Sequence, residues 1–155
     1  AHLPSQAALE LGTSLGLTSA YLARHTGVLT TVEGNPHIQA LAQSYWAKLG
    51  AANIRSFSGE FDATWEALAD RDYDLIFIDG NHRGEALIRY VEKSLPLLHP
   101  DGVIVCDDIH WSPDMEAAWE HLRSMPEWTL QMDAFEWGLL TRNQALKREH
   151  VCIRF

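Results

Sequence analysis

Short apolar runs alternate with helical patterns along most of this chain. The apolar and β-branched runs cover residues 7–11, 28–32, 53–57, 73–78 and 103–106. The helical patterns between and after them cover residues 18–25, 36–49, 62–69, 83–95 and 113–124. Alternation of this kind predicts an α/β fold with a doubly wound, mostly parallel sheet.

Residues that start and stop helices support these boundaries. Asn35 offers a capping side chain before Pro36, and Gly50 is expected to end the helix that follows. Asp62 and Ser112 are expected to cap two later helices.

The last part of the chain follows another pattern. Residues 129–133, 135–141 and 151–155 are expected to form strands without long helices between them, which predicts an antiparallel C-terminal edge. The segment Pro100–Gly102 is typical of a turn before the fifth strand. Residues 1–155 are expected to form a single domain.

Composition narrows the range of partners. The formal net charge of −9 argues against nucleic acid, because phosphate binding needs Lys and Arg surfaces. Cys106 and Cys152 lie in apolar runs without metal-type spacing, as expected of reduced thiols in a cytoplasmic protein. We see no membrane-length apolar run and no signal peptide, and we expect a small-molecule acceptor and no membrane partner.

The most informative stretch follows the first strand. It reads Glu10-x-Gly12-x-x-x-Gly16-x-Thr18, a strand end and a glycine loop before a helix. Gly12 permits a sharp turn, and Gly16 lets the backbone approach a ligand. The spacing differs from the G-x-G-x-x-G that binds a pyrophosphate, so an adenosine ligand with an amino-acid tail fits better. S-adenosylmethionine is such a ligand.

Three stretches together resemble a known family. They are ELGTSLGLTSAYLA (10–23), FIDGNHR (77–83) and VIVCDDIHWSP (103–113). They resemble class I S-adenosylmethionine-dependent methyltransferases, in particular bacterial O-methyltransferases related to the metal-dependent catechol type. The resemblance implies methyl transfer to a hydroxyl oxygen of a small molecule. Such enzymes carry helices before the first strand, which cover the active site. Either these helices are absent here, or a second subunit covers the site. A homodimer is compatible with the sequence.

The cofactor is expected at the carboxyl ends of the strands. Glu33 closes the second strand, where a carboxylate can accept ribose hydroxyls; Glu10 is expected either to neutralise the ligand's ammonium or to brace the loop. By resemblance, Glu60 stands where the family often has an Asp on the adenine amino group. The remaining cofactor candidates are Gly12, Thr13, Ser14, Gly16, Gly59, Phe61 and Asp79.

Three acids near two neighbouring strand ends suggest a cation. Asp79 follows the fourth strand, and Asp107 and Asp108 follow the fifth. Hard carboxylate oxygens suit Mg²⁺ or another divalent cation. By resemblance, Asp108 stands where the metal-dependent enzymes have Asn, which adds charge.

Several ring side chains are candidates for the chemistry. His82 lies three residues beyond Asp79, where the catechol-type enzymes have a lysine base. It is expected either to take the acceptor's proton, with Asp79 nearby, or to bind the metal. His110 and Trp111 are candidates for the acceptor pocket. Trp46, on a helix, is expected to serve packing.

Other function classes remain open at this point. The chain could be a catalytically silent module that binds S-adenosylmethionine or a nucleoside. It could also be a metal-dependent hydrolase using the three acids and His82, which would bind metal without S-adenosylmethionine. The glycine spacing disfavours a nicotinamide oxidoreductase.

Overall fold

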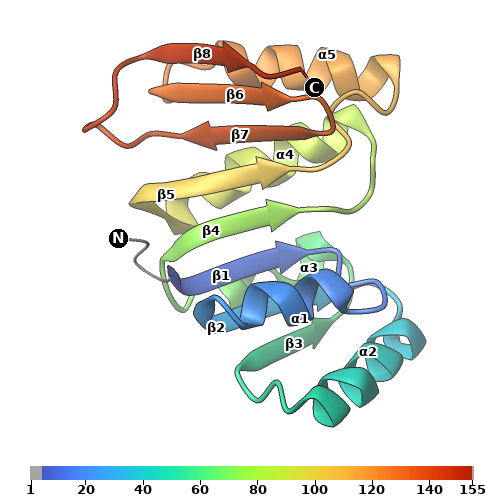
Figure 1. The fold of residues 1–155 in the computed structure, drawn as a ribbon. Helices are drawn as coiled ribbons and strands as arrows, with labels where there is room; N and C mark the ends of the chain where they lie inside the picture. The colour runs from blue at the N-terminus through green and yellow to red at the C-terminus, as the bar shows by residue number, and fades with distance from the viewer. Residues whose placement is uncertain (1–4, 155) are drawn as a thin grey trace. The chain divides into compact units, whose positions relative to one another are not determined.

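The computed structural model describes residues 5–154, drawn in Figure 1. The chain divides into two compact units, one ending at Asp74 and the other beginning at Leu75. Within the described residues no helix is long and apolar enough to span a membrane.

The first unit contains three parallel strands in the order β3-β2-β1. Its elements are β1 (Ser5–Leu11), α1 (Leu17–Ala23), β2 (Thr26–Glu33), α2 (Pro36–Leu49), β3 (Ile54–Ser58) and α3 (Phe61–Leu68). Figure 1 shows α1 and α2 on one face of these strands and α3 on the other. The parallel register aligns the carboxyl ends of the strands: Leu11 lies beside Val32, and Glu33 lies beside Ser58.

The predicted limits of α2 are confirmed. The Asn35 side chain accepts hydrogen bonds from the backbone amides of His37 and Ile38, at 2.9 and 3.4 Å. Gly50 ends the helix with a φ of 69°, a left-handed conformation that favours glycine.

The second unit contains β4 to β8, with β4 beginning two residues before the boundary. Its elements are β4 (Tyr73–Ile78), α4 (Gly84–Ser94), a 3₁₀ turn (Leu95–Leu97), β5 (Leu98–Cys106), α5 (Pro113–Ser124), β6 (Leu130–Ala134), β7 (Trp137–Thr141) and β8 (Glu149–Cys152). The strand order is β4-β5-β7-β6-β8. β7 runs antiparallel to β5 and β6, and β8 runs parallel to β6. The predicted α/β class with an antiparallel C-terminal edge is therefore confirmed.

The predicted turn at Pro100–Gly102 is wrong, because these residues belong to β5. Proline has no backbone N–H, but its φ suits an extended chain. The ladder between β5 and β7 begins only at Val103, so the missing donor breaks none of its hydrogen bonds.

Other boundaries also differ from the prediction, among them the following three. α3 begins at Phe61 with Glu60 at the cap, because the Glu60 carbonyl already accepts helical hydrogen bonds; Asp62 lies in the first turn. β7 begins at Trp137, because Phe135 takes a φ of 69° in the preceding turn. The last strand is Glu149–Cys152 rather than 151–155, and residue 155 lies outside the described residues.

A close packing contact in the second unit generates a stability prediction. Gly138 of β7 lies against Trp119 of α5, whose side chain is fully buried; a Cβ at this glycine would lie 2.5 Å from the indole ring. We therefore expect Gly138→Ala to destabilise the protein by about 1–3 kcal/mol, the usual cost of overpacking. Urea unfolding measures the change.

Gly34→Ala provides the matched control, because a Cβ at Gly34 meets no atom within 4 Å. It should leave the free energy of unfolding nearly unchanged. Equal stability of the two variants would contradict the packing argument.

Candidate functional site

The glycine loop after β1 follows a tightly turned path. Gly12, Ser14 and Gly16 all have positive φ values, of 111°, 48° and 76°. The amides of Gly12 and Thr13 both donate to the Val32 carbonyl, at 3.0 and 3.2 Å. These bonds hold the start of the loop against the end of β2, so its backbone is fixed before any ligand arrives.

Glu33 connects this loop to its neighbours. Its Oε2 accepts the Ser14 amide at 2.9 Å, and its Oε1 accepts the Asn35 amide at 2.9 Å. Its backbone carbonyl accepts the Gly59 amide, also at 2.9 Å. A carboxylate has about four lone-pair sites, so Glu33 keeps acceptor capacity for hydroxyl donors.

Glu10 lies beneath the loop rather than facing solvent. It is fully buried, and its Oε2 accepts hydrogen bonds from the hydroxyls of Ser19 and Thr31, the latter at 2.6 Å. Thr31 also bonds the hydroxyl of Thr13 at 2.6 Å, and Thr13 is only 2% exposed. Of the two roles expected for Glu10, this network favours bracing the loop. The Thr13 side chain belongs to the same brace.

The sequence analysis missed the contribution of Trp46 to the loop. Its indole Nε1 donates to the Gly16 carbonyl at 2.9 Å, and the side chain is 4% exposed. A Cβ on Gly16 would lie 2.5 Å from the same nitrogen. The absence of a side chain at Gly16 therefore lets α2 approach the loop. The helical pattern alone gives no signal of this contact.

The segment after β3 presents one exposed and one buried candidate. Gly59 has a φ of 143°, which favours glycine, and Glu60 is exposed at the start of α3. Phe61 is only 9% exposed. Of these residues, the Glu60 side chain is therefore the more accessible to a ligand.

In the second unit the structure brings together the predicted acids and His82. The Asp107 amide donates to the Ile78 carbonyl at 2.9 Å, which joins the ends of β4 and β5. His82 Nε2 lies 3.7 Å from Asp79 Oδ1, and His82 Nδ1 lies 3.7 Å from Asp108 Oδ2. The imidazole therefore lies between two carboxylates.

Burial raises the pKa of Asp107 to about 6, and the neighbouring charges of Asp79 and Asp108 add to the effect. A hydrogen bond with Asp79 also favours the protonated form. Among residues 5–154, no group of three or more His, Cys, Asp or Glu side chains is arranged to hold a metal ion. The three acids supply suitable oxygen donors, but their side chains do not converge on one point.

His110 and Trp111 follow these acids in the loop before α5. Both His110 ring nitrogens have carboxylate partners, with Nδ1 3.2 Å from Glu116 and Nε2 3.0 Å from Asp133. Trp111 is 71% exposed. The sequence analysis did not predict a role for Asp133. Its acidic side chain in a strand that also contains apolar residues was a signal that could have been noticed.

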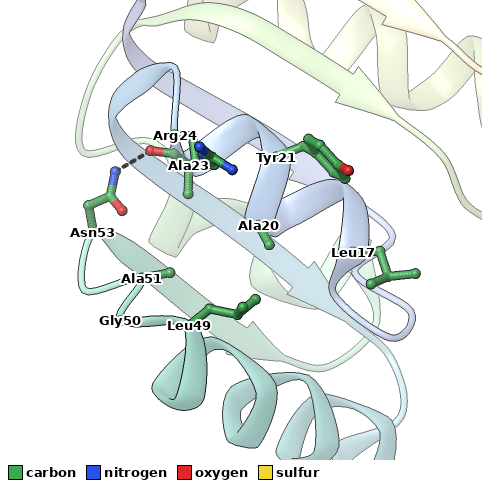
Figure 2. A pocket seen from close by; sticks show the side chains of 9 residues that line it. All are labelled: Leu17, Ala20, Tyr21, Ala23, Arg24, Leu49, Gly50, Ala51 and Asn53. Carbon is green, nitrogen blue, oxygen red and sulfur yellow. Dashed lines mark hydrogen bonds between the residues drawn. The ribbon is translucent and has the colours of Figure 1, made fainter.

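A separate cavity lies in the first unit, between α1 and the segment that joins α2 to β3 (Figure 2). It measures about 660 Å³, and its lining includes Leu17, Tyr21 and Leu49. Asn53 lies at one side and donates to the Ala23 carbonyl at 2.8 Å. No predicted site residue lines it, and converging polar groups of the kind that orient a ligand are scarce there.

Comparisons with known proteins agree on one family. The model of a family described as a methyltransferase domain matches residues 9–109. A protein of Mycobacterium tuberculosis (strain ATCC 25618 / H37Rv), named as a probable O-methyltransferase, is 35% identical over 105 residues, covering 64% of this chain and 46% of that protein. The chain thus spans about half the length of the curated relatives it matches.

Solved structures share the fold. The O-methyltransferase TomG of Streptomyces achromogenes, crystallised with S-adenosylmethionine, superposes with a TM-score of 0.77 at 23% identity, over 89% of this chain and 73% of that one. An O-methyltransferase of Bacillus cereus in complex with S-adenosylhomocysteine gives a TM-score of 0.74 at 20% identity, over 88% and 73%.

The raised pKa of Asp107 generates a prediction for metal-free protein in EDTA. Because the folded-state pKa exceeds the unfolded value, the folded state holds an extra proton between about pH 4 and pH 6. Stability from this group is therefore present below pH 4 and lost as the pH rises through 6. Asp107→Asn removes the dependence, so relative to the native chain it should gain about 2 kcal/mol between pH 4 and pH 7.

Denaturant unfolding at several pH values measures this gain, with the exposed Asp72→Asn as the control. A difference between Asp107→Asn and the native chain that stays constant with pH would contradict the shifted titration.

Proposed function

Because the chain belongs to the methyltransferase domain family, we propose that it transfers a methyl group from S-adenosylmethionine to a hydroxyl oxygen of a small molecule. This proposal rests on the hydrogen bonds that join the glycine loop to the end of β2. The first amides of the loop donate to the Val32 carbonyl, and the Ser14 amide donates to the Glu33 carboxylate. The net charge of −9 supports a small-molecule acceptor rather than nucleic acid.

The first unit has the features that S-adenosylmethionine requires. Because Gly12 and Gly16 have no side chains, a ligand can approach their backbone closely. Glu33 offers carboxylate oxygens to the two ribose hydroxyls. When bound, S-adenosylmethionine supplies a methyl group on a positively charged sulfur, with a neutral leaving group. The loop residues would bind and orient this ligand, and alignment of two reactants contributes up to roughly 7–11 kcal/mol to catalysis.

The second unit would prepare the acceptor. His82 takes the hydroxyl proton as general base, and Asp79 and Asp108, at 3.7 Å from its two ring nitrogens, orient the imidazole and stabilise its charged form. Trp111 would form an apolar wall beside the acceptor.

The proposal also includes a divalent cation that assists the methyl transfer. With a divalent cation such as Mg²⁺ bound, Asp79, Asp107 and Asp108 would rotate to hold it, and the contacts of Asp79 and Asp108 with His82 would give way to it, because carboxylate oxygens are its preferred ligands. A bound cation lowers the pKa of a hydroxyl that it contacts. Burial raises the pKa of Asp107 most, and repulsion from Asp79 and Asp108 adds to it; a cation would relieve this repulsion, which supports the assignment.

Calorimetric titration of S-adenosylhomocysteine, with and without Mg²⁺, tests the function directly. We expect micromolar binding. Metal binding without S-adenosylhomocysteine affinity would instead favour a hydrolase. Affinity for S-adenosylhomocysteine without any transfer activity would favour a silent binding module.

The glycine loop generates a first mutational prediction. Gly12 has a φ of 111°, a conformation that a β-branched residue adopts only under strain. Gly12→Val should therefore abolish S-adenosylhomocysteine binding in the calorimeter. Gly50→Val is the control, because it places the same β-branched residue at another positive φ, 69°, at the C-terminal end of α2. Retained affinity in Gly12→Val would rule out the loop assignment.

The acid group generates a second mutational prediction. Asp107→Ala should weaken Mn²⁺ binding, followed by the electron paramagnetic resonance signal of the free ion, by roughly tenfold or more, because it removes a charged ligand. The affinity for S-adenosylhomocysteine should stay unchanged. Exposed Asp72→Ala is the control. If the native protein binds no Mn²⁺, or turns over equally well in EDTA, the metal role is wrong.

A further inference from the structure

Asp133 of β6 collects hydrogen bonds from three separate segments. It is 4% exposed. His110 Nε2, from the loop before α5, lies 3.0 Å from its Oδ2; the Phe135 amide, in the turn after β6, donates to its Oδ1 at 3.1 Å. Arg154, beyond β8, donates to Oδ1 at 2.8 Å. One buried carboxylate therefore ties two loops and the C-terminal segment together.

The electrostatic balance keeps this carboxylate charged. Burial alone would raise the pKa of Asp133, but hydrogen bonds from Arg154, the Phe135 amide and His110 outweigh it and lower the pKa to about 2. Asp133 is thus an acceptor over the whole physiological range. Glu116, on the other side of His110, is far more exposed, with 59% of its side-chain surface accessible.

The loop that His110 belongs to needs such an anchor. Asp108 has a φ of 55°, a left-handed conformation that non-glycine residues adopt only when their surroundings hold them there. The Trp111 amide closes the loop on the Asp108 carbonyl at 2.9 Å. The buried Ile109 donates its amide to the Glu136 carbonyl at 3.1 Å. This second tie reaches the same turn after β6 that Asp133 stabilises.

We propose that Asp133 is a positioning residue, which acts through His110 to hold the loop carrying Asp107, Asp108 and Trp111 in place. His110 then links this loop to β6 rather than lining an acceptor pocket. The consequence for metal and acceptor rests on the proposed function, but the holding of the loop does not.

Hydrogen exchange of single amides, followed by NMR, tests the link. Because Oδ1 already accepts from the Phe135 amide and Arg154, Asp133→Asn is expected to place its amide nitrogen where Oδ2 was. His110 Nε2 then loses its acceptor, and the Ile109 and Trp111 amides should exchange at least about tenfold faster. The Gly59 amide, bonded to Glu33 in the first unit, is the internal reference for global opening. Asp70→Asn is the control variant, because Asp70 is also paired with arginine and has a pKa lowered to about 2.

Two substitutions of His110 separate the specific link from general damage. The amide nitrogen of Gln lies as many bonds from Cβ as His Nε2 does, so His110→Gln can still donate to Asp133. The amide nitrogen of Asn corresponds to Nδ1, so His110→Asn can reach only Glu116. We expect His110→Gln to keep slow exchange at Ile109 and Trp111, and His110→Asn to match Asp133→Asn.

Binding measurements on the same variants test the functional consequence. Affinity for S-adenosylhomocysteine should not change, whereas affinity for Mn²⁺ should fall about tenfold in Asp133→Asn and His110→Asn, as for other residues that support metal ligands. If the native protein binds neither S-adenosylhomocysteine nor Mn²⁺, the proposed function is wrong. The exchange rates of Ile109 and Trp111 still test whether Asp133 holds the loop. Unchanged exchange at Ile109 and Trp111 in Asp133→Asn, or equal behaviour of the two His110 variants, overturns the proposal.

Discussion

Backbone amides where strands, loops and helices begin need hydrogen-bond acceptors, and in this protein carboxylates supply several of them. Asp74 accepts the amides of Gln6 and Ala7 at 2.7 and 3.0 Å, and Glu33 accepts that of Ser14. In the second unit Asp114 accepts the Gly84 amide at 2.6 Å. Charged acceptors make stronger bonds than neutral ones, so these acids hold the start of β1, the glycine loop and the first turn of α4 in place.

The carboxylates of the two units differ in how far nearby hydrogen-bond donors stabilise their negative charge. In the first unit Glu33 bonds two amides and Glu10 bonds two hydroxyls, so each carboxylate is stabilised by donors from its own surroundings. In the second unit His82 lies 3.7 Å from both Asp79 and Asp108, and burial together with the charges of these two acids raises the pKa of Asp107. A cluster of carboxylates whose negative charges are stabilised this little favours binding a proton or a cation. That property is expected of reacting groups rather than of structural ones.

The sequence predicted the order and type of the elements up to α5, because apolar periodicity and caps such as Asn35 and Gly50 are local signals. It placed Glu33 and Asp79 correctly at the ends of β2 and β4 for the same reason. The contacts that support the candidate site were not predictable, because they join residues far apart in the chain. Examples are the bond from Trp46 to the Gly16 carbonyl and that between His110 and Asp133.

Two glycines among the described residues, each with a tryptophan ring against it, also constrain how the chain can vary. Gly16 and Trp46 in the first unit, and Gly138 and Trp119 in the second, leave no volume for a methyl group between them. A larger residue at either glycine is therefore tolerated only together with a smaller residue at its tryptophan, and at Gly16 only if the new residue also accepts a φ of 76°. In descendants of this chain, each glycine and its tryptophan are thus expected to be inherited as a pair.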